Sequence, residues 1–521
     1  MLLTTNILWD AVALLATAIS SLLIFAYWRL GYWSRKGLYD NDPVFFFGNA
    51  KKLIMKQQNI GEMWKELYEN IRAKGLKHGG GSLLFSPTYV PVDLDIIKNI
   101  MQQDFQHFNS HGTYFNEKGD PLSAHLFALS RQKWRNLRTK LTPTFTSGKM
   151  KMMFSRLVEC GEGLKEMMDE FSQSGKAMDI KEMLQRFTID IIVSCAFGLE
   201  CDTMKNPDND FASKGRNILK PESIGILRIL SFFALPHSLL HKLNVRLTDR
   251  ETESFFMNVV KKNVEYREKN NVYRKDFMHL LLQLKNRGKV ADDEHLTSDG
   301  TVAEGAITFN ELAAQAFVFF VAGYETSSTT MTFALYEIAR DKELQNKMRQ
   351  EIREVLKKND GKLTYEAVKD MELMSRVVEE TLRKYPAISM IPRECTKDYQ
   401  IPGTDITIEK GTSVAISTLG IHRDPEYYPD PLKFDPDRFL EENKRNRHPF
   451  AWIPFGEGPR ACIGLRFGVM QTKVGLASIL ENYDISLSEK TQVPLEFNKS
   501  GGLILSAKGG VWINVTQHVD N

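Results

Sequence analysis

The residue types and spacing most able to do chemistry surround one cysteine, in the stretch FGEGPRACIGLRFG (455–468). Cys462 precedes a run of apolar residues with helical spacing, so its sulfur is expected near the N-terminus of a buried helix. The partial positive charge of a helix N-terminus favours thiolate over thiol. Gly458 and Gly464 remove side chains on either side of the cysteine, and Arg460 adds a nearby cation. We therefore expect a thiolate that is presented to a large, planar, anionic cofactor.

Cys462 could instead be a structural thiol or a zinc ligand. Most isolated cysteines are buried structural thiols. The chain has five cysteines, an odd number scattered along the sequence, which argues against a disulfide framework and for a reducing compartment. A zinc site would need more Cys or His ligands at short spacing, but His448 is fourteen residues away. The sequence therefore gives little support to a zinc site, and the structural thiol is the main alternative.

A second stretch with chemical potential is AGYETSS, in the middle of a proline-free run over 308–340. The run opens with TFNE, a capping box, which predicts one long helix. Gly323 weakens a helix at its midpoint, and the Thr326 hydroxyl can bond the carbonyl oxygen of Ala322. This combination predicts a bend and a notch, in which Glu325 and Thr326 could relay protons. Taken alone, the small residues are better explained by close helix packing.

Two further stretches place charged or aromatic side chains on one helical face. EETLRKYP puts Glu380 and Arg383 three residues apart, a spacing typical of an ion pair. Such pairs contribute little when they are exposed, so a functional role requires a further partner. WRNLRTK puts Trp134 and Arg138 four residues apart, an aromatic ring beside a guanidinium that suits a carboxylate of a bound cofactor.

Phe455, Gly458, Arg460, Cys462 and Gly464 together form the cysteine-ligand signature of the cytochrome P-450 family of haem-thiolate monooxygenases, which the chain resembles. At average residue frequencies, five fixed positions would match by chance in a chain of this length with odds below about 10⁻⁴. The four stretches follow the family's order, and the resemblance covers essentially the whole chain. LTPTFTSGKMK, GIHRDPEYYPDP and FGEGPR are most similar to the insect microsomal branch that handles xenobiotics.

This resemblance implies a role for each of the residues named so far. Cys462 would be the axial ligand of the haem iron, and Glu325 and Thr326 would lie over the distal haem face, where dioxygen is activated. The residues implied to hold the haem propionates are Trp134, Arg138, Arg393 and Arg460, with His111 as a weaker candidate. The other residues implied to contact the haem are Phe455, Gly464 and Ala322. The residues implied to lock the region behind the cysteine loop are Glu380, Arg383 and Arg438.

The substrate pocket is expected on the same helical face as Thr326. Val318, Ala322 and Thr326 repeat at intervals of four residues, and Val321 lies beside them. If Thr326 faces dioxygen, these apolar side chains line the pocket, with core packing as the alternative. The further pocket candidates, from the segment after EETLRKYP and the loop before Trp134, are Ile388, Ile391 and Phe115.

The N-terminal segment predicts a membrane anchor over residues 1–30, followed by one catalytic domain over 31–521. From Ile7 to Trp28 about 22 residues are almost all apolar, enough for one helix across a bilayer. Basic residues follow this span and none precedes it, so the catalytic domain is expected on the cytosolic side of the membrane. The resemblance to the microsomal branch implies that this membrane is the endoplasmic reticulum. A cleaved signal peptide is the alternative. The apolar run 224–236 is a candidate for a second lipid contact, with a buried helix as its alternative. The family's proline-rich hinge is reduced to Pro43.

Composition and periodicity predict a mainly α protein with small β-sheets, in agreement with the cytochrome P-450 fold. Helical spacing dominates the first two thirds of the chain, and DITIEKGTSVAIS (405–417) predicts a hairpin with a glycine turn. The net charge is only +3, without a long basic tract, which argues against nucleic acid as a partner.

The reaction that the resemblance implies is insertion of one atom of O2 into an apolar molecule, while the other atom leaves as water. The sequence contains no glycine-rich phosphate-binding motif, so NADPH electrons must arrive through a partner. The expected partner is NADPH–cytochrome P-450 reductase, with cytochrome b5 as a second donor. Its candidate docking residues are Lys133, Arg135 and Lys140. A haem-thiolate isomerase or dehydratase and a membrane-anchored haem sensor are the rival functions, but neither explains Glu325 and Thr326.

Overall fold

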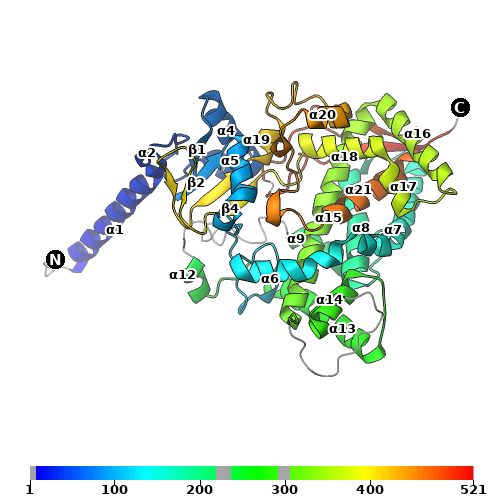
Figure 1. Cartoon of the computed structure of the whole chain (residues 1–521), viewed down its shortest axis with the longest axis horizontal. Coiled ribbons are helices and arrows are strands. Elements are labelled where there is room, and N and C mark those ends of the chain that lie inside the picture. Colours follow the sequence, from blue (N-terminus) through cyan, green and yellow to red (C-terminus); the bar gives the residue numbers. More distant parts are fainter. Residues whose placement is uncertain (1–6, 219–234, 236, 291–304, 501, 520–521) are drawn as a thin grey trace.

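The structure, a computed structural model, describes residues 7–218, 235, 237–290, 305–500 and 502–519. Figure 1 shows a sheet-rich part near the N-terminal helix and a larger helix-rich part that contains the C-terminus. Except for residue 235, the run 224–236 lies outside the described residues. The predicted class, mainly α with small sheets, is confirmed.

Helix α1 (Ile7–Leu30) projects away from the rest of the protein (Figure 1). Its 22-residue stretch Trp9–Leu30 has a mean hydropathy of 2.0, and only 6% of it is buried. Large apolar side chains such as Leu15 and Ile24 are therefore exposed along its length. Exposing this much apolar surface to water is costly, so a lipid bilayer is the environment that suits α1.

The sheet-rich part is built on a mixed four-stranded sheet. Its strands, in order, are β1 (His78–Leu83), β2 (Ser86–Pro91), β7 (Ser413–Ile416) and β4 (Ile391–Glu394). β1 and β2 form an antiparallel hairpin, β2 pairs with β7 in parallel, and β7 pairs with β4 antiparallel. The N-terminal hairpin is thus completed by strands from the C-terminal third of the chain, which ties the two ends of the catalytic part together.

The hairpin predicted over 405–417 is wrong. β6 (Thr407–Ile408) pairs with β5 (Tyr399–Gln400), whereas β7 pairs with β2 and β4. Gly411 adopts a φ of 90°, so the expected turn exists, but it passes the chain from one sheet to another. Three consecutive residues of β7, Val414–Ile416, are buried, which fits the middle of a larger sheet rather than one arm of an exposed hairpin.

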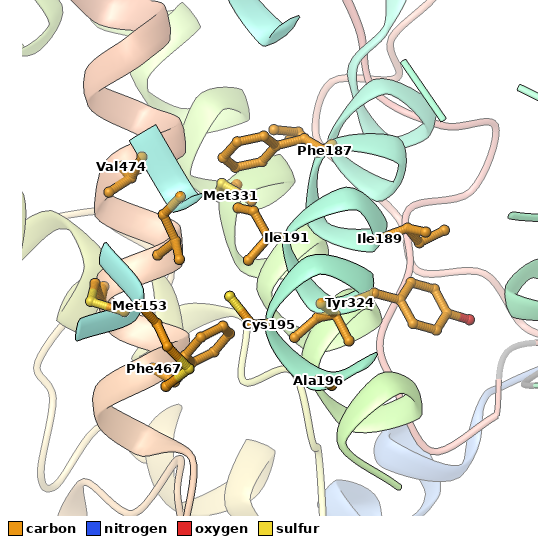
Figure 2. Close-up of a cluster of buried hydrophobic side chains, with 14 of the residues drawn as sticks. Met153, Phe187, Ile189, Ile191, Cys195, Ala196, Tyr324, Met331, Phe467 and Val474 are labelled. Carbon is orange, nitrogen blue, oxygen red and sulfur yellow. The ribbon is translucent and has the colours of Figure 1, made fainter. Parts of the chain in front are cut away.

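The helix-rich part has a core of four helices: α7 (Ser147–Ser174), α8 (Ile180–Ile192), α15 (Phe309–Arg340) and α21 (Leu465–Leu480). α15 packs against α8 and α21, and α7 packs against both of these. Figure 2 shows Phe187, Met331 and Val474 meeting where α8, α15 and α21 converge. A Cβ atom on Gly475 would lie 2.4 Å from the Met331 sulfur, so α21 approaches α15 this closely only with glycine at that position.

The long helix predicted from the capping box is confirmed. α15 begins after Thr308, whose hydroxyl accepts a hydrogen bond from the amide of Glu311, and the Glu311 carboxylate accepts one from the amide of Thr308. The helix continues without interruption past Gly323 to Arg340. A Cβ atom on Gly323 would lie 2.3 Å from Ile192 Cδ1, so this glycine lets α8 approach α15.

The other elements surround these two parts. A three-stranded sheet near the C-terminus has the order β3 (Met178–Asp179), β9 (Trp512–Gln517) and β8 (Tyr483–Leu487). The remaining helices are α2 (Tyr32–Arg35), α3 (Lys51–Ile54), α4 (Ile60–Ala73), α5 (Leu94–Lys98), α6 (Arg131–Leu141), α9 (Asp210–Ile218), α12 (His237–Lys242), α13 (Arg250–Asn270), α14 (Phe277–Arg287), α16 (Lys342–Lys358), α17 (Tyr365–Asp370), α18 (Glu372–Lys384), α19 (Thr418–His422) and α20 (Glu441–Arg445).

Replacing Phe187 by alanine should lower the free energy of unfolding by about 3–5 kcal/mol, because it leaves a void where three helices meet. The Phe187 side chain is completely buried. Chemical denaturation followed by circular dichroism measures the loss. Leu432→Ala is the control, since Leu432 is 63% exposed and its truncation should change stability by less than about 0.5 kcal/mol. Equal losses in both variants would contradict this packing.

Candidate active site

The loop that carries Cys462 is a tight turn held by its own backbone. The amide of Cys462 donates to the carbonyl oxygen of Phe455 at 2.9 Å, which closes the loop into a ring. Gly456 and Gly458 adopt φ values of 69° and 73°, in the left-handed region that glycine tolerates best. A Cβ atom on Gly458 would lie 2.0 Å from the carbonyl oxygen of Met101. Gly458 therefore clears space for the chain itself, which is a reason for a glycine here beyond the expected approach of a cofactor.

Cys462 lies just before α21, as its sequence context predicts. Gly464 is the N-cap of α21, and no protein atom lies within 4 Å of where its Cβ would be. Burial raises the pKa of the Cys462 thiol, while the amide of Gly464 and the Arg138 guanidinium oppose this shift. The cysteine is nevertheless accessible to solvent. The sulfur is thus surrounded by protein and still open on one side, which suits a ligand to a bound group.

Arg460 fastens the cysteine loop to the segment before α6. Its guanidinium donates to the backbone carbonyl oxygens of Asn109, Leu126 and Leu129. It also lies over the indole ring of Trp134, 4.2 Å from the ring centroid. Arg460 is therefore fixed by several neutral acceptors and one aromatic ring, none of which neutralises its charge.

Three guanidinium groups gather beside the cysteine loop. Burial, together with the nearby cations Arg393 and Arg138, lowers the pKa of Arg460 to about 8. The pKa of His111 is also lowered, by burial and by its proximity to Arg393 and Arg460, and its Nδ1 atom bonds the carbonyl oxygen of Phe127 at 2.8 Å. Among the described residues, no carboxylate forms an ion pair with Arg138, Arg393 or Arg460.

Arg393, in β4, shows this charge imbalance most clearly. Its side chain is 2% exposed, and burial lowers its pKa to about 10. One Nη atom donates to the carbonyl oxygen of Pro392, but Nε and the other Nη have no hydrogen-bond partner. Burying a cation without a counter-ion is costly. The cluster of Arg138, Arg393 and Arg460 therefore requires a bound anion with at least one carboxylate-like group.

The centre of α15 has an accessible strip in an otherwise buried helix. Val318, Val321 and Thr326 are partly exposed and Ala322 is exposed, whereas nearly all residues before and after them are buried. The Thr326 hydroxyl donates to the carbonyl oxygen of Ala322 at 2.7 Å, as the sequence predicts. The strip lies beside the crossing with α21, where Gln471 donates to the carbonyl oxygen of Gly323. It therefore combines a small apolar surface with one hydroxyl group.

The Glu325 side chain contacts α8. Its carboxylate lies 3.0 Å from Lys181 Nζ and accepts a 2.7 Å hydrogen bond from Gln185 Nε2, and both partners belong to α8. Burial lowers the pKa of Lys181, and the attraction of Glu325 opposes this shift. The acid next to Thr326 is thus bound by α8.

The predicted contacts of Glu380, Arg383 and Arg438 are all present. Arg383 donates to both carboxylate oxygens of Glu380, at 2.7 and 2.8 Å, and both side chains are completely buried. Arg438 Nε lies 3.6 Å from the same carboxylate. Burial raises the pKa of Glu380, and Arg383 opposes the shift. Arg383 also donates to the carbonyl oxygens of His422 and Pro431, so the cluster joins α18 to the chain before the cysteine loop.

The outer pocket candidates differ in exposure. Phe115 and Ile388 are partly exposed, so their side chains can border a pocket. Ile391 is 8% exposed and belongs to the core under the four-stranded sheet. Its position in β4 places it two residues before Arg393.

Comparison with known proteins assigns the family. The cytochrome P-450 family model matches residues 40–513. Cytochrome P-450 6a2 of Drosophila melanogaster is 40% identical over 506 residues, which cover 96% of this chain and 98% of the relative. Cytochrome P-450 6A1 of Musca domestica is 40% identical over 498 residues, 95% of each chain. The chain belongs to the cytochrome P-450 family. It is a monooxygenase of the insect branch that its sequence resembles.

Haem, the family's cofactor, fits the residues described here. A cytochrome P-450 holds its haem iron through a cysteine thiolate, and Cys462 is the accessible cysteine of the matching loop. The haem propionates are carboxylates, the class of anion that Arg138, Arg393 and Arg460 require. The fit therefore rests on charge as well as on the sequence signature.

Sequence reasoning missed the partners that come from distant segments. Lys181 and Gln185 bind Glu325 from about 140 positions away in the chain. The carbonyl oxygen of Met101, also far away in the chain, leaves no room for a Cβ atom at Gly458. The only local signal was the spacing of Lys181 and Gln185, four residues apart on one helical face.

Replacing Arg393 by methionine should lower haem content without lowering the stability of the haem-free fold, because two of its guanidinium nitrogens have no partner to lose. Haem per polypeptide, measured as the pyridine haemochrome, should fall, while the denaturation midpoint of the haem-free protein should stay constant or rise.

Arg349→Met is the matched control for this test. Arg349 is also buried, but it pairs with Asp484 at 2.8 Å and donates to the carbonyl oxygen of Tyr483. Its loss should destabilise the fold by about 3–5 kcal/mol, as for other broken buried pairs. A haem-free Arg393→Met protein that is equally destabilised would show that Arg393 is structural.

Proposed function

We propose that this cytochrome P-450 inserts one oxygen atom of O2 into lipophilic small molecules, either xenobiotic or endogenous, with NADPH electrons delivered by a reductase. The observation that carries the proposal is the combination of an accessible Cys462 with two buried arginines, Arg393 and Arg460, and a partly buried one, Arg138, none of which pairs with a carboxylate among the described residues. The haem, when bound, would supply the redox-active iron that the reaction with dioxygen requires, and the Cys462 thiolate would hold that iron. Phe455, Gly464 and Ala322 border the same site, and Trp134 supports Arg460 from α6.

In this proposal the chain's own task on the distal side is to bind an apolar molecule and to supply protons. Val318, Val321 and Ala322 offer a small apolar surface, to which Phe115 and Ile388 add from neighbouring segments. The Thr326 hydroxyl can order water beside this surface, and the Glu325 carboxylate can exchange protons with that water. Insertion of one oxygen atom into the substrate consumes two electrons and two protons, and both protons leave with the other oxygen atom as water. Release of peroxide consumes the same electrons and protons, so the oxygen atom that receives the second proton decides whether product or peroxide forms.

Electron delivery and location complete the proposal. NADPH–cytochrome P-450 reductase is the expected donor, with cytochrome b5 as a second one, and the exposed face of α6 is the candidate docking surface. On that face Arg135 is exposed, whereas Lys133 already pairs with Glu117 at 2.5 Å. The apolar helix α1 supports anchoring in the endoplasmic reticulum membrane, with residues 31–521 as the catalytic domain on the cytosolic side.

Cys462→His should abolish the red-shifted Soret band of the reduced protein with CO, because that band marks thiolate ligation. The absorption spectrum measures it directly, and the variant can retain haem through its imidazole. Cys395→Ser is the control and should keep the band, since Cys395 is buried and its thiol donates a hydrogen bond to the carbonyl oxygen of Lys397. A thiolate spectrum that persists in Cys462→His would exclude Cys462 as the ligand.

Thr326→Ala should keep haem, the CO spectrum and substrate binding, because none of these requires the hydroxyl. NADPH consumption should continue while product falls and peroxide rises, since water in the notch loses its ordering group. The measurement is product and peroxide formed per NADPH consumed, with reductase added.

Thr332→Ala is the control for this loss. The Thr332 hydroxyl makes the same type of bond, to the carbonyl oxygen of Ser328 at 2.7 Å, but its side chain is buried elsewhere on α15. Its product yield per NADPH should equal that of the unmodified protein. If Thr326→Ala does the same, Thr326 is a packing residue.

A further inference from the structure

Both carboxylate oxygens of Glu325 are bound by side chains of α8. Lys181 Nζ lies 3.0 Å from Oε1, and Gln185 Nε2 donates to Oε2 at 2.7 Å. Glu325 and Thr326 are consecutive on α15, so their side chains leave the helix about 100° apart. The carboxylate is therefore held to one side of the hydroxyl, at the contact between α8 and α15.

Lys181 is itself held firmly at this contact. Its ammonium donates to the hydroxyl groups of Ser328 and Thr329, at 2.9 and 2.7 Å, in addition to its contact with Glu325. Its side chain is 18% exposed and that of Glu325 is 13% exposed. The ammonium has three protons to donate, and these three partners use them. Neither side chain can leave the pair without losing a charge-assisted contact.

We propose that Lys181 and Gln185 are positioning residues, which hold the Glu325 carboxylate beside the accessible strip of α15 so that electrons are used for product rather than for peroxide. This inference rests on the proposed monooxygenase function. A glutamate with free χ angles samples several rotamers, some of which would place its carboxylate in the notch or away from the water that Thr326 orders. With both oxygens bound, one rotamer is selected, and the distance from the carboxylate to that water is fixed.

The same helix offers a matched control. Glu337, also on α15, binds Lys384 Nζ at 2.7 Å, with side chains 5% and 9% exposed. It lies twelve residues after Glu325, which is about 18 Å along the helix. This second buried lysine–glutamate pair has a similar distance and burial, but Glu337 lies beyond the accessible strip of Val318, Ala322 and Thr326.

The experiment compares Lys181→Met with Lys384→Met in membranes that contain reductase. In Lys181→Met we expect product per NADPH to fall about tenfold and peroxide to rise, less than the ~100-fold or greater loss typical of a removed proton-transfer group. The spectral dissociation constant of the substrate should not change. Lys384→Met should keep its product yield per NADPH. Gln185→Met removes one hydrogen bond and no charge, so it should fold and show a smaller rise in peroxide.

A second measurement does not depend on turnover. Thermal unfolding of Lys181→Met, Glu325→Gln and the double variant forms a cycle in which each single change leaves a buried group without its partner. The double variant should lose less stability than the two single losses combined. Additive losses would show that the pair does not form, and would overturn the inference.

The turnover results separate the two proposals. If the unmodified protein forms no product with NADPH and reductase, the proposed function fails. If it forms product, and Lys181→Met and Gln185→Met both keep its yield per NADPH, the positioning role is wrong while the monooxygenase function stands. Equal loss of yield in Lys181→Met and Lys384→Met would also overturn it, because destabilisation would then explain both.

Discussion

The gathering of three guanidinium groups at one site, two of them buried, is the constraint on which the arrangement of the active site depends. Arg138, Arg393 and Arg460 come from α6, β4 and the cysteine loop, three segments that are far apart in the sequence. Folding brings these three positive charges close together, which costs free energy, and no carboxylate among the described residues pairs with them to offset that cost. A dicarboxylate cofactor offsets it, so haem binding and the final packing of these segments are coupled through the same charges.

α15 must pack closely against its neighbouring helices and must also leave part of its surface accessible to a bound molecule. Glycine and small side chains let α8 and α21 pack closely on it, as at Gly323, where a Cβ atom would overlap Ile192. Nearly all of its other side chains are buried, which keeps the helix rigid. Between its two ends, only the strip from Val318 to Thr326 is left accessible, so a hydroxyl and a small apolar surface are presented by an element that cannot easily move.

Much of this could be predicted because the relevant signals are local. The capping box at Thr308 fixes where α15 begins, and the residues around Cys462 fix both a loop and a helix start. The rest depends on contacts between distant segments. No local pattern shows that Gly458 faces the carbonyl of Met101, that β7 joins β2 rather than β6, or that Glu325 meets Lys181. Strand partners and buried ion pairs are decided by tertiary packing.

The ion pair of Lys181 and Glu325 is difficult to explain by stability alone. Two charges lose their hydration when they are buried, and apolar side chains of similar volume often stabilise a core as well or better. Elsewhere the contact between α8 and α15 includes the buried apolar side chains of Phe187, Ile191 and Met331, shown in Figure 2. The main effect of a charged pair at the end of that contact is therefore to orient the Glu325 side chain. It fixes where one carboxylate stands relative to the hydroxyl beside it, which an apolar pair cannot do.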